Sequence, residues 1–193
     1  MSTLRLRQLV TRLAALLDEA PPEAEILARG GKMLGELITY DDWLPEAFAR
    51  ADAARYSQHL LHCDSLERFC VVSFIWAPGQ ETPIHDHTVW GLVGVMRGGE
   101  MTQAYDRQDG RLAPRGAPRL LAPGEVEALS PALGDIHRVW NASPRQESVS
   151  IHVYGGNIGT IRRSTYSADG SAAPFVSAYS NVQMPNIWSE ADH

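Results

Sequence analysis

The chain has 193 residues, of which 44% are hydrophobic and 21% are charged, a composition typical of a globular protein rather than a disordered one. Its net charge of -6 provides no basic field that would attract a nucleic-acid backbone. The longest apolar runs, such as residues 69–77, are too short to cross a bilayer, and the N-terminus lacks a signal-type apolar core. We therefore expect a cytoplasmic protein with no nucleic-acid or membrane partner and with two reduced cysteines.

Two amphipathic helices are predicted at the start of the chain. Between Leu4 and Ala20, leucines and a valine recur every three or four residues, and the stripe ends at a Pro-Pro pair. A second helix is predicted from Pro22 to about Ile38, followed by a short helical piece within residues 46–54. We expect residues 1–54 to form a helical layer on the rest of a single domain.

From residue 55 onward the sequence predicts a mostly antiparallel β body. Short segments rich in β-branched and aromatic residues alternate with turns that contain Gly, Pro and Asp. The predicted strands are residues 56–62, 69–77, 88–97, 100–106, 125–130, 136–141 and 147–155. The tail after Gly170 retains aromatic residues and is expected to wrap the body as an ordered loop or strand.

Three histidines occur in strand-like surroundings. His85 and His87 lie in "TPIHDHTVWG", and residues two apart on a regular strand project from the same face, where they could bind one metal ion. Taken alone, the His-x-His pattern is more often produced by exposed strand histidines than by a metal site. A third histidine, His137, begins another predicted strand in "LGDIHRVWN".

The glycine spacing around these histidines resembles the two halves of the cupin motif. That resemblance implies a jelly-roll-like β-barrel in which the three imidazoles converge and leave open metal positions. The motif usually has a glutamate at the position of Gly91, so the resemblance implies three neutral ligands and no anionic one. The motif positions are Gly79, His85, His87, Gly91 and Gly98 in the first half, and Gly134, His137 and Asn141 in the second.

Polar and apolar residues alternate in "SVSIHVYGG". Ser150, His152 and Tyr154 share one face of the predicted strand. This face could be solvated, as is common on antiparallel sheets, or the three side chains could form a hydrogen-bonded relay that ends at a phenolic donor. We favour the relay.

Together, His-x-His, the later "HRVWN" and "SVSIHVY" resemble the cysteine dioxygenase family of thiol dioxygenases over roughly residues 56–163. The resemblance implies a mononuclear non-haem iron(II), Fe(2+), held by His85, His87 and His137. It also implies that Ser150, His152 and Tyr154 assist a reaction that adds both atoms of O2 to a thiol and yields a sulfinate. The substrate thiolate would then bring the negative charge that the protein ligands lack.

Two positions differ from the mammalian type of this family. Its cysteine that crosslinks to the tyrosine aligns with Gly91, so Tyr154 is expected to keep a free phenol. Its carboxylate-binding arginine aligns with Gln58, whereas "YGGNIGTIRRSTY" resembles the bacterial 3-mercaptopropionate dioxygenase branch and assigns that role to Arg163. Adjacent Arg162 is the rival, and by composition both would be expected at the surface.

The sequence thus predicts a mainly β cupin with N-terminal helices that oxidises a small thiol carboxylate with O2. We favour 3-mercaptopropionate because no pocket carboxylate is identifiable that would bind the ammonium group of L-cysteine. L-cysteine dioxygenation is the alternative within enzymes, and a non-catalytic cupin that binds a metal or ligand is the alternative of another class. A homo-oligomer is compatible with the sequence.

Overall fold

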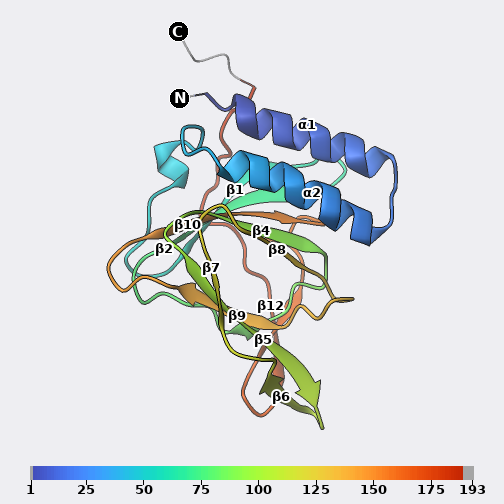
Figure 1. Ribbon diagram of the computed structural model, residues 1–193, viewed down its shortest axis with the longest axis vertical. Helices are drawn as coiled ribbons and strands as arrows, with labels where there is room; N and C mark the ends of the chain where they lie inside the picture. Colours follow the sequence, from blue (N-terminus) through green and yellow to red (C-terminus); the bar gives the residue numbers. More distant parts are fainter. Residues whose placement is uncertain (1, 189–193) are drawn as a thin grey trace.

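The computed structural model describes residues 2–188. Figure 1 shows two adjacent helices lying over one sheet, with a second sheet beneath it. The helical elements are α1 (Leu4–Asp18), α2 (Glu23–Ile38) and the 3-10 turn η1 (Glu46–Phe48). The strands are β1 (Ser57–Cys63), β2 (Cys70–Trp76), β3 (Ile84–His85), β4 (Gly91–Arg97), β5 (Glu100–Gln108), β6 (Arg111–Pro114), β7 (Arg119–Leu121), β8 (Val126–Leu129), β9 (His137–Asn141), β10 (Ser148–Tyr154), β11 (Arg163–Tyr166) and β12 (Ala172–Phe175).

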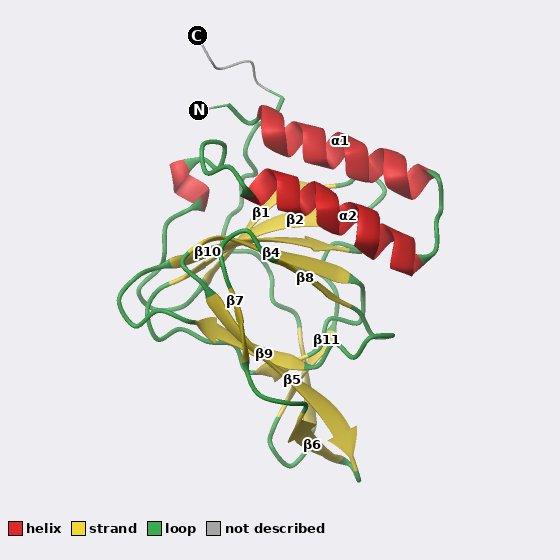
Figure 2. Cartoon of the chain, in the orientation of Figure 1, coloured by secondary structure: helices red, strands yellow, loops and turns green. Residues whose placement is uncertain are grey.

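The strands form two antiparallel sheets that face each other, as the yellow arrows of Figure 2 show. The upper sheet has the order β1-β2-β10-β4-β8, and the lower has the order β12-β11-β3-β9-β5-β6, with β7 paired to β5. The mainly β class with N-terminal helices is therefore confirmed. Consecutive strands often belong to different sheets, so residues far apart in the sequence meet between them.

The helices cover the outer face of the upper sheet. Leu6, Leu13 and Leu16 of α1 are fully buried, and α2 lies against β4. Gly94 on β4 permits this approach, because a Cβ atom there would lie 2.9 Å from Ile38 Cδ1 and 3.1 Å from Leu34 Cγ. The predicted leucine stripe therefore packs against the sheet and carries no polar group that would serve chemistry.

Strand β10 is buried on both faces. Val149, Ile151 and Val153 join the core beneath the helices, whereas Tyr154 belongs to the apolar cluster between the sheets. Ser150 and His152, on the same face as Tyr154, are 0% and 5% exposed. The alternative in which this polar face is solvated is therefore wrong, since closure of the second sheet shields it.

Within the described residues, no helix is long and apolar enough to cross a membrane. Cys63 and Cys70 are opposite each other on β1 and β2, and both are free thiols. Cys70 is fully buried, and burial raises its pKa to about 11, so it stays protonated at neutral pH.

Candidate metal centre

Three buried histidines meet between the sheets. His85 ends β3, where its register partner on β9 is His137. His87 lies two residues further on, beyond the end of β3, so the two histidines converge without sharing one regular strand. One nitrogen from each ring nevertheless lies within 4.8 Å of the others. The ring centroids are 4.8 to 4.9 Å apart, a spacing that fits a single ion held by three imidazoles.

Hydrogen bonds at the far side of two rings fix which nitrogen faces the centre. His85 Nδ1 lies 3.1 Å from the Pro83 carbonyl oxygen, which can only accept, so Nδ1 donates. His137 Nδ1 lies 3.3 Å from Thr102 Oγ1. Both contacts leave Nε2 available as a ligand, because a metal-binding histidine usually donates its other ring N–H to a neighbouring acceptor.

All three imidazoles are held neutral. Burial lowers the pKa of His85 to about 4. Burial also lowers the pKa values of His87 and His137 well below the ordinary value, with a further contribution from the neighbouring histidines. At neutral pH each ring therefore presents a lone pair rather than a proton, which is the form that binds a cation.

Asp135 fixes the backbone that carries His87. Its Oδ2 accepts hydrogen bonds from the backbone N–H groups of His87 at 2.8 Å and Thr88 at 3.1 Å. The His87 ring nitrogen Nδ1 lies 3.9 Å from the same oxygen, beyond hydrogen-bond distance, and has no partner among the described residues. Thr88 has a φ of 61°, a left-handed conformation that threonine rarely adopts, so the two hydrogen bonds stabilise an otherwise unfavourable turn.

We expect Asp135→Ala to weaken divalent-metal affinity about 10- to 100-fold, because the turn that orients His87 loses both acceptor contacts. The measurement is metal binding by titration calorimetry, with circular dichroism to check the fold. Asp106→Ala, which removes a half-exposed carboxylate from β5, is the matched control and should bind metal normally. Equal affinities in the two variants would show that Asp135 does not support the metal ligands.

The three polar side chains of β10 are connected end to end. Tyr154 Oη lies 2.8 Å from His152 Nδ1, and His152 Nε2 lies 2.8 Å from Ser150 Oγ. Burial lowers the pKa of His152 to about 3 and raises that of Tyr154 above its ordinary value, so both are neutral at physiological pH. The Tyr154 ring stacks on His87 with centroids 5.5 Å apart, which places this chain of hydrogen bonds beside the three histidines.

Gly91 lies directly opposite Tyr154 in the β4–β10 register. A Cβ atom at Gly91 would lie 3.0 Å from Tyr154 Cδ1 and 2.8 Å from Leu129 Cδ1, so a larger side chain would require these neighbours to move. With no thiol at this position, Tyr154 keeps its phenol free of the crosslink.

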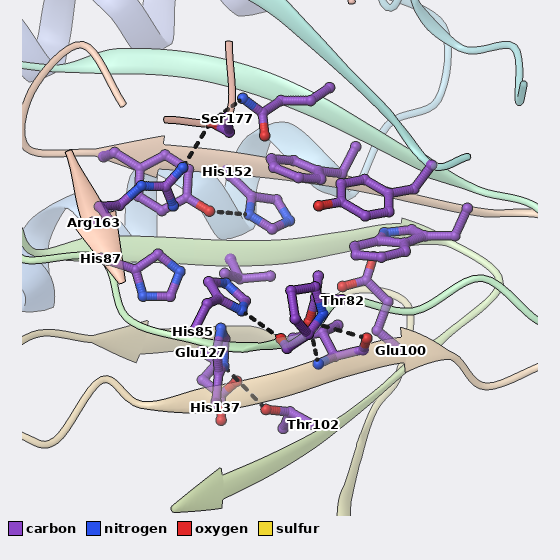
Figure 3. A pocket seen from close by; sticks show the side chains of 18 of the residues that line it. Thr82, His85, His87, Glu100, Thr102, Glu127, His137, His152, Arg163 and Ser177 are labelled. Atoms are coloured by element: carbon purple, nitrogen blue, oxygen red, sulfur yellow. Dashed lines mark hydrogen bonds between the residues drawn. The ribbon is translucent and has the colours of Figure 1, made fainter. Parts of the chain in front are cut away.

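Arg163 brings a buried cation to the pocket, on the same side as His87 in Figure 3. Its side chain is held by a 2.7 Å hydrogen bond from Nη2 to Ser177 Oγ and by the Phe175 ring, 4.5 Å from the guanidinium carbon. Nε has no partner within residues 2–188, and burial lowers the pKa without removing the charge. Arg162, in contrast, is exposed to solvent.

Gln58 also lines the pocket, from β1. Its Nε2 donates to Ser177 Oγ at 3.0 Å and to the Ala178 carbonyl at 2.5 Å. Ser177 thus contacts both Gln58 and Arg163, so the two side chains share one wall. Ser177 was not recognisable from the sequence, because a serine in a polar tail carries no periodic signal.

Two carboxyl groups in the pocket lining, Glu100 and Glu127, correct the expectation that the pocket has none. Glu127 Oε1 accepts a hydrogen bond from Arg119 Nη1 at 3.4 Å, so this carboxylate already has a cationic partner. Glu100 is 1% exposed and lies on the side of the pocket away from Arg163 (Figure 3). In the sequence Glu100 follows a Gly-Gly turn, a position where a glutamate is ordinarily solvated.

These features define a two-sheet β protein with a buried three-histidine metal site beside a cationic pocket. The family model for cysteine dioxygenase type I matches residues 33–167. The chain belongs to this family. It is also 26% identical over 151 residues to cysteine dioxygenase type 1 of Danio rerio, an alignment that covers 69% of this chain and 73% of the relative.

Solved structures with similar chain traces include an uncharacterized conserved protein with a double-stranded β-helix domain from Klebsiella pneumoniae. It is 19% identical, with a TM-score of 0.47, and the match covers 61% of this chain and 93% of that one. A cupin superfamily protein from Desulfitobacterium hafniense is 14% identical, with a TM-score of 0.45, and the match covers 61% and 94% of the two chains.

Proposed function

We propose that this protein is a non-haem iron(II) thiol dioxygenase that converts a small thiol carboxylate to its sulfinate with O2. Family membership supports thiol dioxygenation with a three-histidine site. The observation that carries the substrate class is the buried Arg163 guanidinium, which has no anionic partner among the described residues and borders the same pocket as the histidines. In a substrate with both a thiolate and a carboxylate, the thiolate can neutralise a metal ion bound by the three histidines while the carboxylate pairs with the Arg163 guanidinium.

The residues present fit a bound metal ion. His87 Nδ1 is buried without a partner, and His85 and His137 each engage only one ring nitrogen in a hydrogen bond. Three imidazoles suit several first-row metals, and the family favours iron(II) among them. Iron(II), when bound by His85, His87 and His137, supplies the oxygen chemistry that amino-acid side chains cannot perform.

The pocket residues then orient the reactants. Arg163 holds the substrate carboxylate with its planar fork, while Ser177 and Phe175 hold the guanidinium in place. Apolar side chains such as Phe74, Val93 and Val139 line the remaining wall and limit the entry of water. The thiol is thereby fixed at one end of a short molecule whose other end is anchored, which lowers the entropic cost of reaction.

Tyr154 supplies a proton donor on the pocket side. Its hydroxyl is the terminal group of the Tyr154–His152–Ser150 relay, in which both O···N distances are 2.8 Å. Because the phenol is neutral and its orientation is fixed by His152, it can donate a hydrogen bond to an oxygen atom of the reacting dioxygen. Ser150 holds His152 in the orientation that this donation needs.

The geometry also bears on the choice between 3-mercaptopropionate and L-cysteine. The α-ammonium group of cysteine lies next to its carboxylate, so binding to Arg163 places it at the cationic wall. Glu100 lies away from that wall, and Glu127 is already paired with Arg119. An ammonium group beside Arg163 would remain uncompensated, and we therefore favour 3-mercaptopropionate.

Oxygen uptake and sulfinate formation by the iron-loaded protein test the proposed function with a panel of small thiols. Stoichiometric uptake with 3-mercaptopropionate, at a higher specificity constant than with L-cysteine, is the expected result. Higher specificity for L-cysteine would overturn the substrate assignment, and no uptake with any thiol would favour a protein that only binds metal or ligand.

We expect Tyr154→Phe to retain iron and to lower turnover, or the yield of sulfinate per O2 consumed, about 10- to 100-fold. The change removes only the hydroxyl that His152 orients, and the ring packing against His87 remains. Tyr40→Phe, at a surface position that is 46% exposed, is the control and should behave as the unmodified enzyme. Normal rate and coupling in Tyr154→Phe would exclude the donor role.

A further inference from the structure

Glu100 is a buried carboxyl group that the proposed mechanism does not use. It begins β5, lines the pocket and is 1% exposed. Neither carboxyl oxygen has a hydrogen bond of normal geometry to another described residue, and the same holds for the Trp76 indole nitrogen. A buried carboxyl without close partners is unfavourable when ionised, so its position calls for a functional explanation.

The start of β5, where Glu100 lies, contacts the serine end of the relay strand β10. The Gly99 N–H donates to Ser148 Oγ at 3.3 Å, and Asn141, the register partner of Glu100, donates from Nδ2 to the carbonyl of Trp76, which is the register partner of Ser148. Burial raises the pKa of Glu100 to about 7, while the Ser150 hydroxyl, the Trp76 indole and the Ser148 hydroxyl are near enough to lower it. Glu100 also contributes to the raised pKa of Tyr154, at the other end of the relay. The relay therefore ends at a group that can change its charge near neutral pH.

The strands packed around Glu100 bring few other ionisable groups. Glu127 on β8 raises the pKa of Glu100, and Glu127 itself is paired with Arg119 of β7. On β9, Asn141 is the register partner of Glu100, whereas Thr102, and not Glu100, contacts the candidate ligand His137. The titratable or charged groups on these strands are His152 and Tyr154 on β10, Glu127 on β8, Arg119 on β7, and His137 and Arg138 on β9, of which Arg138 is paired with Glu81.

A series of donations that runs unbroken from Glu100 to Tyr154 can take two directions. A protonated Glu100 can donate to Ser150, which then donates to His152 Nε2; His152 Nδ1–H donates to the Tyr154 oxygen, and the phenolic proton points into the pocket. An ionised Glu100 can only accept a hydrogen bond, so the Ser150 hydroxyl donates to Glu100 instead of to His152. His152 then carries its proton on Nε2, and Tyr154 donates to Nδ1 instead of toward the pocket.

We propose that Glu100 is the fourth member of the relay, a positioning residue whose proton decides whether Tyr154 donates toward the pocket. This inference rests on the proposed function, because it assigns a control element to the same site. It transfers no electron and consumes no reactant: the relay gains one proton from solvent, which ends on Glu100. The hydroxyl hydrogens of Ser150 and Tyr154 change direction, and His152 changes tautomer, losing the proton on Nε2 and gaining one on Nδ1.

The sign of the pH effect follows from these two directions. Below the pKa of Glu100 the carboxyl is protonated, and the relay donates into the pocket. As pH rises through about 7, Glu100 ionises and the Tyr154-dependent rate falls. For a single group with this pKa, the fall between about pH 6 and about pH 8 is about tenfold.

The decisive variant is Glu100→Gln, whose amide is always neutral and can donate to Ser150 at every pH. We expect kcat of the iron-loaded variant to lack the fall that the unmodified enzyme shows between pH 6 and 8. Glu127→Gln is the matched control: it removes a neighbour that raises the Glu100 pKa, so the fall should persist and move to lower pH. The same fall in Glu100→Gln and in the unmodified enzyme would overturn the inference.

Infrared difference spectroscopy between pH 5 and 8 provides a readout that needs neither iron nor turnover. The metal-free, unmodified protein should show the carbonyl band of a carboxylic acid at pH 5, and this band should be lost as pH rises through neutrality. Glu127→Gln should show the same band and its loss, whereas Glu100→Gln should lack the band. An identical band in Glu100→Gln would assign the titration to another residue and overturn the inference. Because the spectra are independent of activity, absence of thiol oxidation would refute the proposed function without affecting this result.

Discussion

Replacing His87 with alanine is expected to abolish stoichiometric iron binding and, with it, thiol oxidation. The His87 ring is 1% exposed, its pKa is lowered by burial, and Asp135 holds its backbone. Alanine therefore removes one of three neutral imidazoles that the structure holds in position. Two remaining imidazoles would leave a site with too few protein ligands for tight binding. Iron content after loading and gel filtration, measured with oxygen uptake on the same sample, gives the result.

His62→Ala is the control for the loss of one histidine, because His62 lies on β1 outside the pocket lining and packs against Phe69. It should retain iron and activity. The fold of His87→Ala should also persist, since a metal site with open positions contributes less to folding than a closed structural one. Full iron occupancy in His87→Ala would remove this residue from the ligand set.

Arg163→Ala is expected to lower kcat/KM for 3-mercaptopropionate about 10- to 150-fold, the loss that corresponds to a charge-assisted hydrogen bond of about 1.5 to 3 kcal/mol. The guanidinium is buried against Phe175 and tied to Ser177, and within residues 2–188 it has no acidic partner in the protein. Its removal therefore leaves the substrate carboxylate without a cation. Steady-state kinetics with both 3-mercaptopropionate and L-cysteine measure the loss.

Two comparisons isolate this effect. Arg162→Ala changes the exposed neighbour and should leave kcat/KM within about twofold, as surface substitutions usually do. A thiol without a carboxylate, such as 2-aminoethanethiol, should be nearly insensitive to Arg163→Ala. If Arg162→Ala caused the larger loss, the carboxylate-binding role would belong to that residue.

Sequence patterns predicted the long elements because those elements have a repeating apolar face. The helix predicted from Leu4 ends at Asp18 in α1, and the strand predicted at residues 147–155 is β10 (Ser148–Tyr154). The short strands β3, β6, β7 and β11 were missed, and β12 lies in the tail for which only an ordered loop or strand was expected. A segment of two to four residues is too short to show a period, and its pairing depends on the strands beside it.

Some residues of the candidate site could be recognised from the sequence, and others could not. His85, His87 and His137 were recognisable because their side chains and spacing carry a motif, and the structure brings their rings together. Glu100 was not recognisable, since its burial results from the lower sheet closing over β10, a contact between strands distant in sequence. The family resemblance favoured Arg163 over Arg162, but composition alone could not choose between them, because the register of β11 determines which side chain faces inward.

The pocket wall around Arg163 comes partly from the end of the chain. Phe175 lies opposite Arg163 in the β11–β12 register, and Ser177 follows two residues later, whereas the family match ends at residue 167. The histidines all lie within the matched region. Substitutions at Phe175 and Ser177 would therefore alter the surroundings of the Arg163 guanidinium while the three histidines stay unchanged, so this wall of the pocket can diverge within a family that keeps the histidine cluster.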